Sequence, residues 1–157
     1  MNGSLAADEK AKILEIASRH PRKSAACIEA LKIAQAHHRW ISEERLNDVA
    51  RLLHMTEEEL QSIASFYSLI YRKPVGRHVI HLCDSISCWV TGYRELARCL
   101  KEKLQIDFGG TTADGRFTLL PICCLGACDK APCLMIDDET LTNVNRESLD
   151  EVLNSYE

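Results

Sequence analysis

The stretch that decides the fold is Cys83-Asp84-Ser85-Ile86-Ser87-Cys88, together with its downstream counterpart Cys124-Leu125-Gly126-Ala127-Cys128. Each segment follows an apolar run that is typical of a β-strand. The polar residues between the first two thiols favour a loop, and Gly126 allows the main chain to turn with a positive φ and to approach a bound group closely. We therefore interpret these cysteines as a metal centre, with the rest of the chain as its scaffold and as a docking surface.

The composition is that of an ordinary globular chain. Its 157 residues are 46% hydrophobic and 27% charged, enough for one domain or two small ones. The net charge of −4 comes from 19 basic and 23 acidic residues that are interleaved, without the basic run that favours nucleic-acid or membrane-surface binding. Neither class of partner is expected.

Two observations concern location. The first twenty residues contain Asp8, Glu9 and Glu15 and lack the apolar core of a targeting segment. The longest mostly apolar run, Phe117–Cys128, is too short to cross a bilayer. We expect a cytoplasmic chain without membrane insertion, in which eight cysteines favour metal or redox chemistry over disulfides.

Residues 8–70 carry the apolar periodicity of helices. Four helices are expected, with their N-caps at Ser4 or Asp8, at Ser24, at Ser42 and at Thr56. Thr56 and Glu59 have the spacing of a capping box, in which each side chain accepts a hydrogen bond from the other residue's backbone N–H. Cys27 falls on an apolar helix face and is expected to pack in the core. The sequence predicts a small helical bundle.

His37 and His38 are potential metal ligands in this helical half. Adjacent residues point to different sides of a regular helix, so the two imidazoles are not expected to bind one ion. We interpret them as a solvated pair near a helix end.

Pro74-Val75-Gly76 marks a domain boundary, because the apolar period changes after it. We expect a helical domain over residues 1–73 and an α+β domain over residues 74–157. The second domain should contain strands at Arg77–Leu82, Phe117–Ile122, Leu134–Ile136 and near Leu141, and helices at Gly92–Leu104 and after Asn145. Pro121 indicates a strand edge or end. This order predicts a small sheet with helices packed against it.

The cysteine spacing favours iron over zinc. Structural zinc sites often use tight C-x2-C knuckles, and the chain has none. A Rieske-type centre needs two histidines; His81 lies near the first pair, but no second histidine lies near the downstream pair. A thioredoxin-type dithiol needs C-x-x-C, which is also absent. A [2Fe-2S] cluster held by four thiolates is therefore the favoured centre.

Spacing alone leaves the downstream ligands open. Cys123, Cys124, Cys128 and Cys133 offer several pairs. Both Cys123–Cys128 and Cys128–Cys133 repeat the interval of Cys83–Cys88. Cys99 lies on a predicted helix and is assigned to packing.

At this point the chain resembles the family of E-type subunits of bacterial NADH:quinone oxidoreductase, the respiratory complex I. The resemblance rests on C-x4-C followed by C-L-G-x-C, at Cys83 to Cys88 and Cys124 to Cys128. The agreeing flanks are Ser65-Phe66-Tyr67, Pro74-Val75-Gly76-Arg77-His78, Asp114-Gly115-Arg116-Phe117-Thr118-Leu119 and Ala131-Pro132. Cys133 departs from the pattern, because that position is usually apolar in the family.

The resemblance implies a thioredoxin-like [2Fe-2S] ferredoxin domain, preceded by a helical domain that docks on the flavin- and NADH-binding subunit. It implies Cys83, Cys88, Cys124 and Cys128 as the cluster ligands, with no catalytic residue on this chain. FMN and NAD are expected on the partner subunit, with whose flavin the chain would exchange single electrons. The complex would place it in a peripheral arm on the cytoplasmic face of the inner membrane.

Alternatives remain at the level of sequence. Related family members serve in NAD-linked hydrogenases and formate dehydrogenases, and these motifs do not separate them from the respiratory enzyme. A free ferredoxin-like carrier or a metal-stabilised interaction module is the other alternative, although a simple carrier has little need of the helical half. The candidate docking surfaces are the two cysteine loops with Trp89, and the aromatic residues Phe66, Tyr67 and Tyr71. The alternative for these aromatic residues is burial within so small a bundle.

Overall fold

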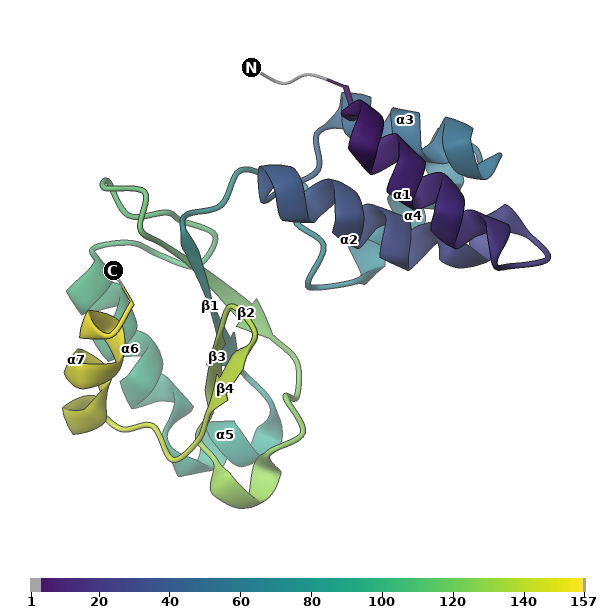
Figure 1. Cartoon of the computed structure of the whole chain (residues 1–157). Coiled ribbons are helices and arrows are strands. Elements are labelled where there is room, and N and C mark those ends of the chain that lie inside the picture. Colours follow the sequence, from purple (N-terminus) through teal and green to yellow (C-terminus); the bar gives the residue numbers. More distant parts are fainter. Residues whose placement is uncertain (1–3, 157) are drawn as a thin grey trace. The chain divides into compact units, whose positions relative to one another are not determined.

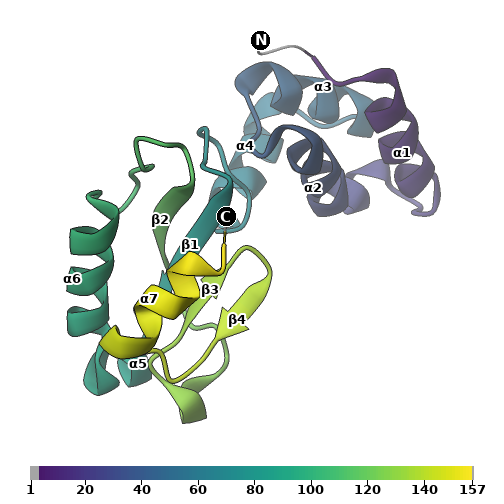
Figure 2. The ribbon, with the colours of Figure 1, turned by 60° about the vertical axis from the view of Figure 1, so that its left-hand side comes forward.

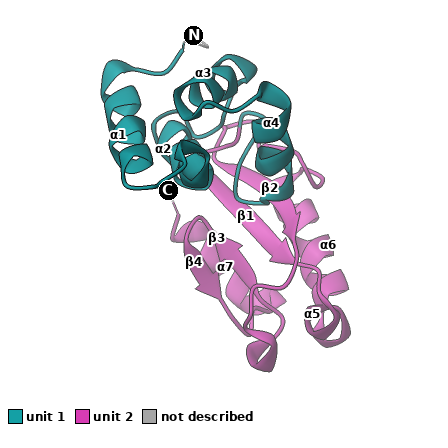
Figure 3. Cartoon of the chain, turned by 90° about the vertical axis from the view of Figure 1, so that its right-hand side faces the viewer, with its two compact units in different colours: residues 1–74 teal, residues 75–157 magenta. Residues whose placement is uncertain are grey.

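The computed structural model describes residues 4–156 and divides into two compact units, Met1–Pro74 and Val75–Glu157 (Figure 3). The first unit is helical and the second combines helices with a sheet. Among the described residues, none of the helices combines the length and the apolar character needed to span a bilayer.

The first unit is a bundle of short helices, all of them visible in Figure 1. Its elements are α1 (Ala7–Ser18), the 3-10 turn η1 (Lys23–Ala26), α2 (Cys27–His38), α3 (Glu43–Leu53) and α4 (Glu57–Phe66). Their apolar faces form one core, which includes the fully buried side chains of Ile13, Leu31, Ile41, Leu53 and Leu60. Cys27 packs in this core, as predicted.

Two of the predicted N-caps are confirmed and two are wrong. Ser42 accepts a hydrogen bond from the Arg45 backbone N–H, and Thr56 forms the capping box with Glu59. The second helix begins at Cys27 rather than after Ser24, because the 3-10 turn η1 intervenes.

The first helix has its N-cap at Ala6, not at Ser4 or Asp8. Ala6 has no side-chain oxygen that could accept a hydrogen bond from the first turn, so the cap consists of a side chain of the helix that accepts from the Ala6 backbone. The Glu9 carboxylate accepts a hydrogen bond from the Ala6 backbone N–H at 2.7 Å. The first helix therefore has only the half of a capping box that the acidic side chain supplies.

The second unit is built on a four-stranded sheet in the order β2-β1-β3-β4 (Figure 2). The strands are β1 (His78–Cys83), β2 (Phe117–Ile122), β3 (Leu134–Ile136) and β4 (Glu139–Leu141). The β1–β2 pair is parallel, whereas β1–β3 and β3–β4 are antiparallel. All four lie where the sequence predicts them, and Pro121 sits on the edge strand β2, which tolerates the missing N–H.

One face of this sheet is covered by α6 (Tyr93–Leu104) and α7 (Arg146–Asn154). Because side chains alternate along a strand, alternate strand residues share a core with the two helices. These are Ile80 and Leu82, Phe117 and Leu119, and Leu134 and Ile136, with Leu96, Cys99 and Leu100 of α6 and Leu149 and Leu153 of α7. Asn145 caps α7 through its side-chain oxygen, as predicted.

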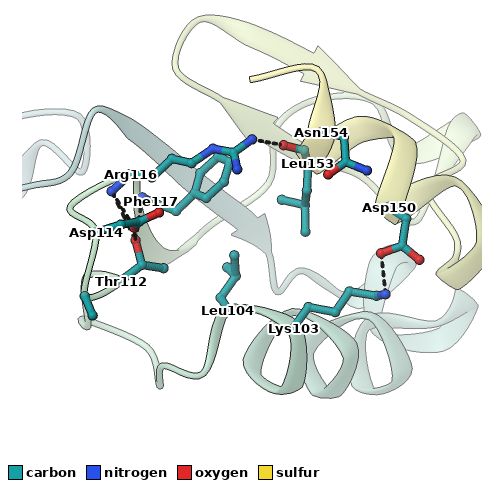
Figure 4. A pocket seen from close by; sticks show the side chains of 10 residues that line it. Lys103, Leu104, Thr112, Asp114, Arg116, Phe117, Asp150, Leu153 and Asn154 are labelled. Carbon is teal, nitrogen blue, oxygen red and sulfur yellow. Dashed lines mark hydrogen bonds and ion pairs between the residues drawn. The ribbon is translucent and has the colours of Figure 1, made fainter. Parts of the chain in front are cut away.

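Figure 4 shows a pocket between α6, the start of β2 and α7. Several of the polar side chains around it form hydrogen bonds or ion pairs. Arg116 donates hydrogen bonds to the carbonyl oxygens of Leu153 and Tyr156, each at 2.6 Å. Lys103 pairs with Asp150. These contacts fasten α7 to the rest of the unit.

The segment between the first two cysteines differs from the prediction. It was expected to be a loop, but Ile86–Thr91 forms the short helix α5, which contains Cys88. Cys83 is the last residue of β1, so the two thiols approach across a strand–helix corner. Six residues are too few for an apolar period to reveal the helix in the sequence.

Candidate metal centre

Cysteines gather at one edge of the sheet because of the strand directions. The parallel strands β1 and β2 end at the same edge, so Cys83 and the segment that follows Ile122 lie close together. The antiparallel strand β3 begins at that edge, just after Cys133. Backbone hydrogen bonds join the three segments: Cys83 donates to the Cys133 carbonyl and Asp84 to the Ile122 carbonyl.

Three thiols form a buried group at this edge. The sulfur atoms of Cys83, Cys88 and Cys133 lie within 4.8 Å of one another, and each residue is about 1% exposed. The Cys88 and Cys133 sulfurs are 3.5 Å apart. Partly buried apolar residues pack around them, namely Ile122, Leu125, Ala127 and Ala131. This packing keeps water away from the thiols.

Cys124 and Cys128 form a second, exposed pair with sulfurs 3.3 Å apart. The turn at Gly126, whose φ is +84°, directs the Gly126 backbone N–H to the Cys124 sulfur at 3.3 Å. This donor lowers the pKa of Cys124. A hydrogen bond of this kind stabilises negative charge on sulfur, which is what a thiolate ligand requires.

The two groups adjoin each other along the cysteine segments. The pKa of Cys124 is lowered further by the Cys128 and Ser85 side chains. The pKa of Cys128 is raised first by Cys124 and also by Cys88, while the Ser87 side chain lowers it. The upstream segment of Cys83 and Cys88 therefore faces the downstream pair.

The thiols fit a multinuclear iron–sulfur centre. A tetrahedral metal ion with metal–sulfur bonds of about 2.3 Å separates two sulfur ligands by about 3.8 Å. The Cys124–Cys128 distance of 3.3 Å is close to that value. Sulfur donors in two adjoining groups match the thiolate ligation of such clusters.

Cys133, which spacing left among the possible downstream ligands, belongs to the buried group. It lies in direct contact with Cys83 and Cys88. Burial raises the pKa of its thiol to about 12, and burial also raises the pKa of Cys88. Sequence spacing could not place Cys133, because the pairing of β3 with β1 brings it there.

The remaining cysteines of the second unit lie outside these two groups. Cys99 is buried on α6 in the core, in line with its expected packing role, and Cys123 is exposed. His81 is buried within β1, and burial lowers its pKa to about 4. Its imidazole is therefore neutral at physiological pH.

An exposed apolar patch flanks the thiols on α5. Ile86 and Val90 are 81% and 78% exposed, and Trp89 is 47% exposed. Trp89 stacks on Tyr93, with Arg94 over its ring at 4.8 Å. We call Ile86, Trp89 and Val90 the α5 patch. Three large apolar side chains exposed on one short helix are typical of a protein-binding surface.

The first unit carries a second exposed apolar group at the end of α4. Phe66 is 80% exposed, and Tyr67 and Leu69 are about 40% exposed. We call these three residues the α4 patch. The two patches contain Trp89, Phe66 and Tyr67, three of the aromatic residues that were expected from the sequence to form docking surfaces.

Comparisons with known proteins identify the family of the chain and several relatives. Residues 13–157 match the family described as thioredoxin-like [2Fe-2S] ferredoxin. The chain is 46% identical over 129 residues to the E-type subunit of NADH-quinone oxidoreductase from Buchnera aphidicola subsp. Acyrthosiphon pisum, covering 82% of this chain and 80% of that protein. It is 47% identical over 132 residues to the subunit of the same name from Escherichia coli strain K12, covering 84% and 80%.

A solved structure shares the fold at lower identity. The crystal structure of an NAD+-reducing [NiFe]-hydrogenase in the air-oxidised state matches with a TM-score of 0.65 and 23% identity. The match covers 84% of this chain but 22% of that longer chain. At this identity the likeness concerns the fold alone.

Proposed function

Because the chain belongs to the thioredoxin-like [2Fe-2S] ferredoxin family, we propose that it is the electron-transfer subunit of an NADH:quinone oxidoreductase. In this role it exchanges single electrons with the flavin of a partner subunit that binds NADH. The observation that carries the proposal is the gathering of thiols at one sheet edge, directly beside the exposed apolar α5 patch. An electron carrier needs its centre close to a surface that its donor can cover.

We propose Cys83, Cys88, Cys124 and Cys128 as the four ligands, one pair from each cysteine segment. A [2Fe-2S] cluster, the cofactor of this family, supplies one-electron chemistry when it is bound. The Gly126 N–H would donate to the ligand sulfur of Cys124 and so favour added negative charge. Cys133 would support the buried side of the site as a neutral thiol.

The exposed side of the site suits electron exchange. Cys124 and Cys128 are exposed, whereas Cys83 and Cys88 are buried. A partner that covers the exposed pair and the α5 patch would approach the centre closely and exclude water from it. The α4 patch would add a second contact, made by the helical unit, with the same flavoprotein.

The partner subunit would hold FMN and NAD. Membership of the respiratory complex would place the chain in its peripheral arm, on the cytoplasmic face of the inner membrane. This placement follows from the proposed complex.

The respiratory enzyme is favoured over an NAD-linked hydrogenase by the extent of the similarity. Identity to the E-type relatives is 46–47% and covers 80% of their length. Identity to the hydrogenase chain is 23% over 22% of its length. A free carrier is disfavoured, because it would have little need of the helical unit. That unit contributes none of the five cysteines at the sheet edge.

The test is NADH-dependent reduction of the reconstituted chain. We expect NADH alone to leave its visible absorption unchanged, and NADH with the purified flavoprotein subunit to bleach it. The flavoprotein should also co-purify with a tagged form of the chain. Reduction by NADH without a partner, or stoichiometric flavin binding by the isolated chain, would contradict the proposal.

A further inference from the structure

Glu9 is a carboxylate in an unusual position at the start of α1. It is 2% exposed, which is rare for a glutamate. Its Oε2 accepts the hydrogen bond from the Ala6 backbone N–H, but its buried Oε1 has no hydrogen-bond partner among the described residues. A buried charged oxygen without a partner is costly unless a cation or a proton neutralises it.

His38 faces this carboxylate from the end of α2. Its Nε2 lies 3.5 Å from Glu9 Oε2, and this buried nitrogen also lacks a hydrogen-bond partner among residues 4–156. His37 completes the group, with its ring centroid 5.1 Å from that of His38. One ligand atom from each of the three residues lies within 4.8 Å of the other two.

The sequence-based expectation was that the two histidines do not bind one ion, whereas the structure places a ligand atom of each within 4.8 Å of the other. Both histidines lie in the last turn of α2, and Arg39 follows with a left-handed φ of 67°. A third ligand from α1 also lies within reach of both imidazoles. Nothing in the sequence indicated this third ligand, because an acidic residue in the first turn of a helix is common.

A proton on His38 accounts for the group less well than a metal ion does. A charge-assisted hydrogen bond between imidazolium and carboxylate is about 2.7–2.9 Å long, shorter than the 3.5 Å found here. Two ligands of a tetrahedral zinc ion, each bonded at about 2.1 Å, lie about 3.4 Å apart, which matches the observed separation.

We propose that Glu9, His37 and His38 form a binding site for a divalent transition-metal ion of the zinc class. Two imidazoles and one carboxylate suit Zn2+, whereas Ca2+ and Mg2+ prefer oxygen ligands. His37 is exposed, which leaves room for water as a further ligand. The bound ion would join the start of α1 to the end of α2 and stabilise the helical unit.

The test uses the full chain with its iron–sulfur centre assembled, so that the cysteines near the sheet edge are occupied. Equilibrium dialysis against Zn2+ alone should load about one zinc per chain. X-ray absorption fine structure at the zinc edge should show nitrogen and oxygen ligands at about 2.0–2.2 Å, without sulfur at about 2.3 Å. Failure to bind zinc, or a shell that contains sulfur, would overturn the proposal.

Substitution of each histidine tests whether it is a ligand of the zinc ion. His37→Ala and His38→Ala should each weaken zinc binding at least ten-fold, and zinc should no longer raise their melting temperature as it does for the native chain. His20→Ala, an exposed histidine just after α1, is the matched control and should bind zinc as the native chain does. Undiminished zinc affinity in both His37→Ala and His38→Ala would also overturn the proposal. Far-ultraviolet circular dichroism and a cooperative thermal transition confirm that the helical unit of each variant is folded.

Discussion

At the scale of single residues, Gly126 has two separable roles in the candidate centre. Its positive φ permits the turn between Cys124 and Cys128, and its N–H donates to the Cys124 sulfur. Gly109 offers a matched comparison, since it has the same φ of +84° and likewise nothing within 4 Å of an added Cβ. Its N–H donates to a main-chain carbonyl instead, that of Leu119.

Gly126→Ala and Gly109→Ala should therefore differ in one property. Each should lower the free energy of unfolding by about 1 kcal/mol, because a side chain is disfavoured at this φ. Relaxation of that strain in Gly126→Ala should also lengthen the hydrogen bond to sulfur and lower the reduction potential of the centre. Denaturant titration and redox titration measure the two effects. An equal shift in potential for Gly109→Ala would contradict the assigned role of Gly126.

At the scale of elements, the helices and strands of both units follow from local signals. Apolar periods predicted the helices, and Thr56 and Asn145 predicted two of the caps that the structure contains. The sequence did not reveal one short helix and two non-local contacts. Helix α5 is too short to show a period. The contact of Cys133 with Cys88 depends on strand pairing, and the approach of Glu9 to His38 depends on helix packing.

The attachment of α7 gives a prediction at this scale. Arg116→Met removes two hydrogen bonds from a partly buried guanidinium, one to the Leu153 carbonyl (Figure 4) and one to the Tyr156 carbonyl. We expect the free energy of unfolding to fall by about 2 kcal/mol, as for charged hydrogen bonds elsewhere. Arg98→Met is the control, because Arg98 pairs with Glu95 on the exposed face of α6. A similar loss in both variants would show that Arg116 does not fasten α7.

At the scale of the whole molecule, the two exposed apolar patches lie on different units and should serve different steps. The α4 patch belongs to the helical unit, which lacks the cysteines of the sheet edge. The α5 patch adjoins those cysteines. Binding of the flavoprotein and transfer of electrons should therefore be separable by mutation.

Phe66→Ser should weaken binding of the flavoprotein about ten-fold, as for an exposed aromatic anchor, but leave the rate of NADH-dependent reduction at saturation unchanged. Val90→Asp should lower that rate even at saturation, because a charge in the α5 patch would prevent close approach. Leu14→Ser, at a 42% exposed position on α1, is the control for both. Binding titrations and stopped-flow reduction measure the two quantities. Identical effects of Phe66→Ser and Val90→Asp would contradict this division.

The central claim is that one pair of cysteines from each segment holds the cluster, while Cys133 supports it without binding iron. The most direct measurement is iron and sulfide content after anaerobic purification of Cys124→Ala and Cys133→Ala, with Cys99→Ala as the packing control. We expect about two irons and two sulfides per chain, with visible charge-transfer absorption, in the native chain, Cys133→Ala and Cys99→Ala, and little or none in Cys124→Ala. Loss of iron from Cys133→Ala with retention in Cys124→Ala would contradict the account.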